Sequence, residues 1–286
     1  MKLFTTLFIS TLVHLGFTQN LVSNPSFENR TDDFCGIMHL TDFDATAEDW
    51  YSPTQSTPDL YFTTINPTCY NYMPNSSYSG PITLKGSQLP RTGEVMAGLM
   101  LYSLAGLSQR EYLQILLDSP LNIGETYVVE CYVSLGDNME FATNGMGMYL
   151  STQPISLTSD GVLNYSPQIT SSNVISETQN WVLLSDTITA TEAHTYVTIG
   201  NFNSDAQTTT IPNQTSSTTF YGSYYYVDDV NISSTRTLNT AENSINKKRE
   251  LVKIIDFMGR ETEFKPNTPL IYIYNDGTRE RVFQSE

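Results

Sequence analysis

The chain has 286 residues and a formal net charge of −16 at pH 7, because 30 acidic residues outnumber 14 lysines and arginines. The excess lies between residues 20 and 246, where 23 acidic residues stand against five basic ones. This balance argues against nucleic acid or anionic lipid as a partner, since both need a basic surface. It suits a neutral glycan or a divalent cation, and it equally suits a protein that is simply soluble outside the cell.

Residues 1–19 have the pattern of a secretory signal peptide. A short positive start at Met1 and Lys2 precedes an apolar run from Leu3 to Phe17, and cleavage is expected near Gln19. The run is shorter than the roughly 18 residues that a membrane span needs, and polar chain follows it. We therefore expect a mature protein that is secreted or held on the outer cell surface, without membrane insertion.

Residues 20–232 are predicted to form one all-β domain, an antiparallel β-sandwich. Apolar and polar residues alternate in several segments, which is typical of strands with one face in a core. The predicted strands are Glu111–Leu117, Thr126–Leu135, Gly145–Ser151, Trp181–Thr189, Thr195–Phe202 and Tyr224–Ile232. Arg30–Ser87 and Thr152–Thr178 lack this alternation and are predicted to be long loops, where binding residues usually lie.

The three cysteines have different surroundings in the sequence. Cys131 alternates with Val129 and Val133, so we expect it on the core face. Cys35 and Cys69 lie in loop-like segments, and we expect them to form a disulfide in an oxidising compartment. No Cys/His spacing indicates a zinc site.

Two short motifs mark the ends of this domain. It opens on Asn24 to Glu28 (Asn-Pro-Ser-Phe-Glu) and closes on Tyr226 to Val230 (Tyr-Val-Asp-Asp-Val). A Pro-Leu-x-x-Gly-x-x-Tyr segment and a strand beginning at Trp181 lie between them in that order. This combination resembles the galactose-binding-like jelly rolls of carbohydrate-binding modules, particularly the cellulose- and xylan-binding group. The resemblance covers about residues 20–232 and departs in the Arg30–Ser87 insertion, which is longer than those modules usually carry.

The resemblance implies a structural calcium ion. Asp228 alternates with Val230 and Ile232, which predicts a carboxylate on the core face, where an unpaired charge is costly. In the family resembled, a Glu of the first strand and an Asp of the last strand bind calcium through their oxygen atoms. Carried over, the ligands are Glu28 and Asp228, with Asp229 as the alternative. The other interpretation is that both aspartates cap a strand end in water.

Glycan binding is predicted in the first long loop. Sugars have apolar ring faces that stack on aromatic side chains, and hydroxyls that need polar neighbours. Trp50 with Tyr51, and Tyr70 with Tyr72, are the first candidates for such a platform, because Asn and Asp residues are interleaved with them. The alternative for any one ring is that it pins the loop onto the sandwich.

The sequence contains no recognisable catalytic motif. Beyond the signal peptide the histidines are His39 and His194, and neither His-Glu-x-x-His nor Gly-x-Ser-x-Gly occurs. Acidic residues cluster at 42–49 and at 137–140. A glycosidase needs two carboxyls about 5–9 Å apart across a cleft, which spacing in a sequence does not establish. The chain is therefore predicted not to be an enzyme, and a hydrolase with an unrecognised carboxylate pair stays as an alternative.

A small β unit is predicted at residues 251–286, behind a Ser/Thr/Asn-rich linker at 233–250. Strands are expected around Val252 and Ile254, at Leu270–Tyr274 and at Arg279–Phe283. Three short strands bury little core, so the unit is more suited to docking or addressing than to chemistry.

Two elements of this tail carry a second resemblance. They are Asp256 to Arg260 (Asp-Phe-Met-Gly-Arg), and the Tyr272 to Tyr274 strand followed by Asp276 and Gly277. They resemble the C-terminal sorting domain of the type IX secretion system of Bacteroidota, in a short variant that lacks the Pro-Asn-Pro start. The resemblance implies export by the type IX secretion machinery.

Together these features predict a secreted or cell-surface, non-catalytic carbohydrate-binding module exported by type IX secretion. The alternative from another class is a surface adhesin or structural protein that meets protein partners.

Overall fold

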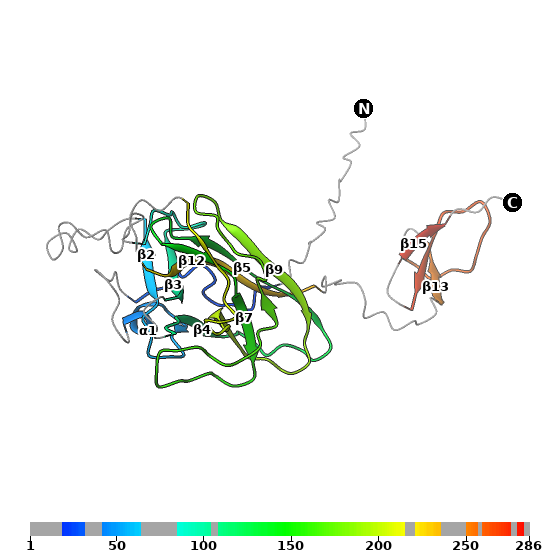
Figure 1. The fold of residues 1–286 in the computed structure, drawn as a ribbon. Coiled ribbons are helices and arrows are strands. Elements are labelled where there is room, and N and C mark those ends of the chain that lie inside the picture. The colour runs from blue at the N-terminus through cyan, green and yellow to red at the C-terminus, as the bar shows by residue number, and fades with distance from the viewer. Residues whose placement is uncertain are drawn as a thin grey trace, which may run out of the picture. The chain divides into compact units, whose positions relative to one another are not determined.

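The computed structural model describes residues 19–31, 42–63, 85–103, 108–214, 221–235, 250–256, 259–275 and 279–282. The chain forms two compact units (Figure 1): residues 17–237 make up one, called here the body, and the part of the other that lies at residues 238–286 is called here the tail. Within the described ranges, no helix has the length and hydropathy of a membrane span.

The body is an antiparallel β-sandwich of jelly-roll type, as predicted. Sheet A has the strand order β1-β4-β10-β7-β8, and sheet B has the order β2-β3-β12-β5-β9. The strands of sheet A are Trp50–Tyr51, Tyr112–Leu116, Tyr196–Asn201, Met146–Ser151 and Ile169–Thr170. Those of sheet B are Asp59–Phe62, Val95–Tyr102, Ser223–Ser234, Thr126–Leu135 and Val182–Thr189. A two-stranded ribbon, β6 (Phe141–Thr143) with β11 (Thr210–Pro212), and one short helix, α1 (Asp42–Thr46), complete the described elements.

The core lies between the two sheets. It is formed by the inward-pointing side chains of their strands, which are mostly apolar. Ile115, Val197 and Leu150 are register partners across sheet A, and all three are buried. Cys131 and Val133 contribute from β5 in sheet B, and Cys131 is a free, fully buried thiol. Both sheets therefore share one hydrophobic cluster, as the alternation in the sequence predicts.

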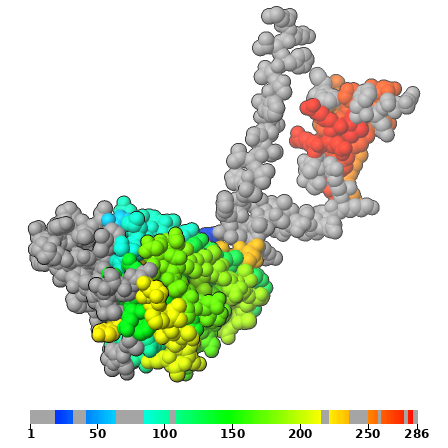
Figure 2. Space-filling model, turned by 45° about the horizontal axis from the view of Figure 1, so that its top comes forward, coloured from blue at the N-terminus to red at the C-terminus, as the bar shows by residue number. Residues whose placement is uncertain are grey.

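All six predicted strands are present, and their bounds differ from the prediction by two residues or fewer. Strand β3 was not predicted, because Val95–Tyr102 is apolar on both faces and shows no alternation. The first predicted loop contains α1, β1 and β2, so Arg30–Ser87 is only partly a loop. In the space-filling view, green and yellow segments from the middle of the chain cover most of the visible face of the body (Figure 2).

The prediction that Asp228 points into the core is wrong, because β12 contains a β-bulge. The pairing with β5 shifts between Asp228 and Asn231, and Asp229 has a positive φ of 49°. Val227 and Ile232 point inward on either side of the bulge, whereas Asp228 lies opposite Tyr132 on the outer face of sheet B. An extra residue in one strand reverses the face of the residues after it, and no local pattern in the sequence marks its position.

The first segment of the body is fastened to its last strand. Asn20 donates to the carbonyl of Val230 at 2.9 Å and accepts from the amide of Ile232 at 2.9 Å. The carbonyl of Pro25 accepts from the amide of Val230 at 2.9 Å. The two ends of the body thus lie side by side.

The tail is a three-stranded antiparallel sheet in the order β13-β14-β15, with bounds Leu251–Ile255, Leu270–Tyr274 and Arg279–Val282. The predicted turn after β13 is closed by Asp256, which accepts from the amide of Arg260 at 2.9 Å and from its Nε at 3.0 Å. Leu270 is the tail's one buried apolar residue in the described ranges. The unit is therefore nearly all surface, as its size predicts.

Candidate functional site

The outer face of sheet A is crossed by the loop of residues 152–168, which β4 holds in place. Gln114 points outward and makes two hydrogen bonds with the backbone of Ile155, both at 3.0 Å. Tyr112 also points outward, and its hydroxyl accepts from the amide of Leu163 at 3.0 Å. The loop therefore covers the middle of the sheet, and the open part of the face is at the end of β7.

Two tyrosine rings form a stack at this open end. Tyr149 alternates with the inward Met148 and Leu150, so its ring lies on the outer face, where Tyr165 of the loop packs on it. Their ring centroids are 4.9 Å apart with an interplanar angle of 28°. Phe202 also packs against Tyr149, with ring centroids 5.9 Å apart. Tyr165 is 44% exposed, so a fixed aromatic surface faces solvent.

A pocket of about 400 Å³ opens beside this stack. Its volume is within the range of about 300–1,000 Å³ that is usual for small-molecule sites. Polar side chains line most of the rest of it, and they are Ser151, Thr152, Gln153, Gln168, Thr191, Glu192 and His194. An aromatic surface next to several hydrogen-bonding groups matches the two kinds of surface that a sugar ring presents.

His194 is the most deeply placed titratable group of this pocket. It is 6% exposed, and its Nδ1 is buried without a hydrogen-bond partner. Burial lowers the pKa of His194 below its ordinary value of 6.5, against the opposing effect of Glu192. At neutral pH the imidazole is therefore uncharged, and the pocket presents a neutral ring beside the carboxylate of Glu192.

The predicted platform of the first loop is only partly on the surface. Trp50 is 1% exposed, packs on Phe27 at 4.9 Å and donates to the carbonyl of Asn24 at 2.7 Å. It is therefore a core residue, and its prediction as a ligand-binding ring is wrong. Tyr51 points the opposite way, is half-buried and lies beside Gln114 on the outer face of sheet A.

Several other predicted residues lie outside the described ranges. They are Tyr70 and Tyr72 of the platform, Cys35 and Cys69 of the disulfide, and His39. The two acidic clusters, at 42–49 and 137–140, lie within the described ranges. Asp44 accepts from the amide of Ser52 and Asp137 from that of Ser87, both at 2.7 Å, so these carboxylates hold turns.

The outer face of sheet B also carries tyrosines, of which Tyr61 and Tyr224 are buried. The hydroxyls of Tyr224 and Tyr61 donate to Asp59, at 2.7 Å and 3.2 Å, and lie 3.0 Å from each other. Gly98 leaves the room for this contact, since a Cβ there would lie 2.4 Å from the Tyr224 hydroxyl. The polar groups here bind one another, so the cluster joins β2 to β12 and exposes no ring.

Glu111 lies next to this cluster and brings a second carboxyl close to Asp59. It accepts from the amide of Met100 at 2.7 Å and from the hydroxyl of Thr57 at 3.3 Å. Burial, and then the charge of Asp59, raise its pKa from 4.5 to about 8. Spacing along the chain gives no sign of this pair, because its members are about 50 residues apart and come together only in the folded body.

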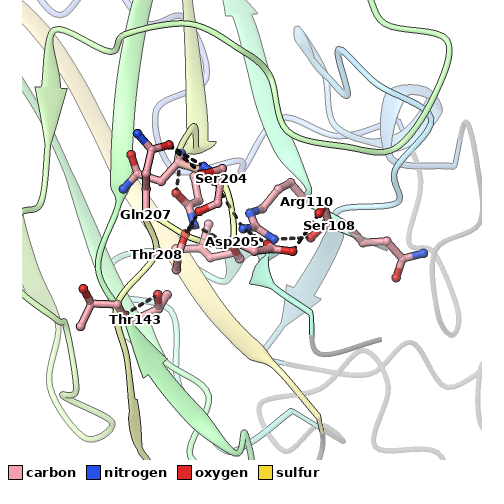
Figure 3. A network of polar contacts seen from close by, with 12 residues as sticks. Ser108, Arg110, Thr143, Ser204, Asp205, Gln207 and Thr208 are labelled. Atoms are coloured by element: carbon pink, nitrogen blue, oxygen red, sulfur yellow. Dashed lines mark hydrogen bonds and ion pairs between the residues drawn. The ribbon is translucent and has the colours of Figure 1, made fainter. Parts of the chain in front are cut away.

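Another polar network, around Asp205, fixes the turn after β10. Arg110 is fully buried and donates to Asp205 at 2.6 Å, and Ser108 donates to the same carboxylate at 2.8 Å. Figure 3 shows both side chains directed at Asp205, with Ser204, Gln207 and Thr208 gathered in the same turn. The groups bind one another, so this network stabilises the turn. Another pocket, of about 490 Å³, is lined by residues 122–126 and Thr235 without an aromatic ring, so the pocket beside Tyr149 is the better candidate site.

The comparisons with known proteins concern the fold. No family model and no curated protein matches the sequence. The CBM22-1 xylan-binding domain of Paenibacillus barcinonensis Xyn10C is 11% identical, with a TM-score of 0.37 over 77% of this chain and 96% of that domain. A putative sugar binding protein from Bacteroides thetaiotaomicron is 11% identical, with a TM-score of 0.36 over 76% of this chain and 100% of its own.

The K2 cleaved adhesin domain of Lys-gingipain is also 11% identical, with a TM-score of 0.34 over 76% of this chain and 98% of that domain. At this identity, likeness extends to the β-sandwich alone.

The residues that build the pocket were missed in the sequence. Tyr149 could have been found, because the alternation that sends Met148 inward sends Tyr149 outward. The other pocket residues come from two loops, and only the folded conformation of these loops brings them to Tyr149. They are Tyr165, Glu192 and His194.

Proposed function

We propose that this protein is a secreted or cell-surface carbohydrate-binding module that takes a glycan in the pocket beside Tyr149 and Tyr165. The observation that carries the proposal is an exposed ring, Tyr165, stacked on Tyr149 beside hydrogen-bonding side chains. Stacking supplies the apolar contact, and Gln153, Glu192 and His194 supply partners for hydroxyl groups.

The ligand class is inferred from charge. The stretch 20–246 has 23 acidic and five basic residues, a difference of −18, and Glu192 adds a carboxylate in the pocket itself. Acidic polysaccharides are repelled by such a surface, so neutral glycans are the expected ligands.

Binding to soluble neutral polysaccharides, with xylan and a mixed-linkage glucan as probes, tests the proposal. Tyr165→Ala should weaken binding about tenfold or more, since a central aromatic contact contributes on the order of 2 kcal/mol. Tyr221→Ala is the matched control, because Tyr221 is 71% exposed and lies outside the pocket. Equal losses in both variants, or no binding by the wild type to any neutral glycan, would reject the assignment.

The export proposal rests on the tail. Its sheet is a compact unit of its own, its strands have few buried residues, and its Asp256–Arg260 turn is closed by its own ion pair. Such a unit is suited to recognition by the type IX secretion machinery. Deleting residues 251–286 should leave the glycan affinity of the body unchanged and abolish export. Normal export of the truncated chain would contradict this role.

A further inference from the structure

The calcium ligands implied by the jelly-roll resemblance are already engaged by hydrogen-bond donors. Asp228 is fully buried, and its Oδ2 accepts from the amides of Arg91 and Thr92 at 2.7 Å and 3.3 Å. Its Oδ1 accepts from the amide of Asp229 at 2.7 Å. The Oε1 of Glu28 accepts from the amides of Glu94 and Val95 at 2.8 Å and 2.9 Å. One segment, residues 91–95, therefore joins the two carboxylates that a cation would join.

The chain also supplies a positive charge next to these carboxylates, that of Arg91. The guanidinium of Arg91 forms an ion pair with Asp229 through Nη1. The hydroxyls of Ser26 and Thr92 donate to the same aspartate. One face of the guanidinium lies over the ring of Tyr132, 3.4 Å from its centroid. A planar cation is held on one edge by a carboxylate and on one face by an aromatic ring, which are the two contacts that arginine makes best.

These contacts do not fit a calcium site. Calcium takes six to eight oxygen ligands with free lone pairs, whereas N–H groups point at Asp228 and Glu28, and a guanidinium pairs with Asp229. Among the described residues, no group of three or more His, Cys, Asp or Glu side chains is arranged to hold a metal ion.

We infer that Arg91, together with the amides of residues 91–95, replaces a structural cation in fastening the first segment of the body to its last strand. The bulge at Asp228 allows Arg91 and these amides to take the place of a cation. It turns Asp228 to the outer face, where the 91–95 segment passes, and leaves Asp229 with a positive φ beside the guanidinium. The body is thereby closed by its own side chains, independently of calcium.

Thermal unfolding of the full chain tests this inference. The melting temperature of the wild type should be the same after chelation as in millimolar CaCl2. Arg91→Met keeps an unbranched side chain over Tyr132 and removes the charge, and it should lower the melting temperature by about 2–4 °C for a domain of this size. Arg260→Met is the matched control, because it removes an ion pair of the tail and should leave the unfolding of the body unchanged.

A double-mutant comparison isolates the ion pair. In an Asp229→Asn background, Arg91→Met should lower the melting temperature much less than it does in the wild type, because its partner charge is already gone. A wild-type melting temperature that falls on chelation and recovers with calcium would overturn the inference. An undiminished effect of Arg91→Met in the Asp229→Asn background would overturn it as well, and both readouts are independent of glycan binding.

Discussion

The two outer faces of the sandwich use the same residue type in opposite ways. On sheet A, Tyr149 and Tyr165 stack beside a pocket, and Tyr165 stays 44% exposed. On sheet B, Tyr61 and Tyr224 are buried, and their hydroxyls are bound to Asp59. Tyrosine content therefore does not identify a binding face. What distinguishes the two faces is whether a ring reaches solvent, as Tyr165 does and Tyr61 and Tyr224 do not.

The largest difference in stability should occur between variants of two neighbouring residues of β1. Trp50→Ala should lower the free energy of unfolding by about 3–5 kcal/mol, because it empties a core site and removes a buried hydrogen bond. Tyr51→Ala removes a half-buried ring from the outer face and should cost only about 1 kcal/mol. Chemical denaturation of both variants measures the difference. Similar losses for the two would mean that Trp50 is not packed in the core.

A smaller effect should separate the tyrosine hydroxyls of the two faces. Tyr224→Phe removes a 2.7 Å hydrogen bond to the carboxylate of Asp59, and such bonds contribute about 1.5–3 kcal/mol. Tyr149→Phe is the matched change on sheet A and should stay within about 0.5 kcal/mol of the wild type. Urea titrations of both variants measure the two costs. A larger cost for Tyr149→Phe would reverse the distinction between the closed face and the open one.

The two faces should also respond to pH from opposite directions. The folded-state pKa of Glu111 is raised from 4.5 to about 8, so the folded protein holds a proton there that the unfolded chain has lost. Its contribution to stability is full below about pH 4.5 and is lost as the pH rises towards 8. Glu111→Gln should reduce this decline, measured as melting temperature against pH, and Asp228, whose pKa burial raises from 3.8 to about 7, should keep the rest of it.

On the pocket side the sign is reversed. Burial lowers the folded-state pKa of His194 below 6.5, so the unfolded chain takes up the proton first, and stability is lost as the pH falls below 6.5. His194→Gln should lessen the loss of stability on the acid side of the profile and leave the alkaline side unchanged; Asp205 and Asp229, whose pKa values are lowered, keep the rest of the acid loss. If both variants altered the same side of the plot of melting temperature against pH, the two groups would be titrating together. That result would contradict their separate positions in the structure.

Much of the fold was determined locally along the chain. Alternation in segments such as Thr126–Leu135 fixes which side chains face a core, because successive residues of a strand point to opposite faces. That rule placed Cys131 in the core, and glycine and asparagine turn signals separated the strands of the tail. It failed at β3, where both faces are covered, since burial on both sides removes the alternation.

The candidate site was decided by tertiary structure. The sequence predicts Trp50 and Tyr51 equally well as ligand-binding rings. Only the pairing of β1 with β4 turns Trp50 inward and Tyr51 outward. Tyr149 and Tyr165 meet because Gln114 and Tyr112 tie the intervening loop across sheet A. A single-residue bulge moved Asp228 from the core side to the outer side, where residues 91–95 reach it. Such outcomes depend on which strands pair and where the register shifts, and long-range pairing leaves no periodic trace in the sequence.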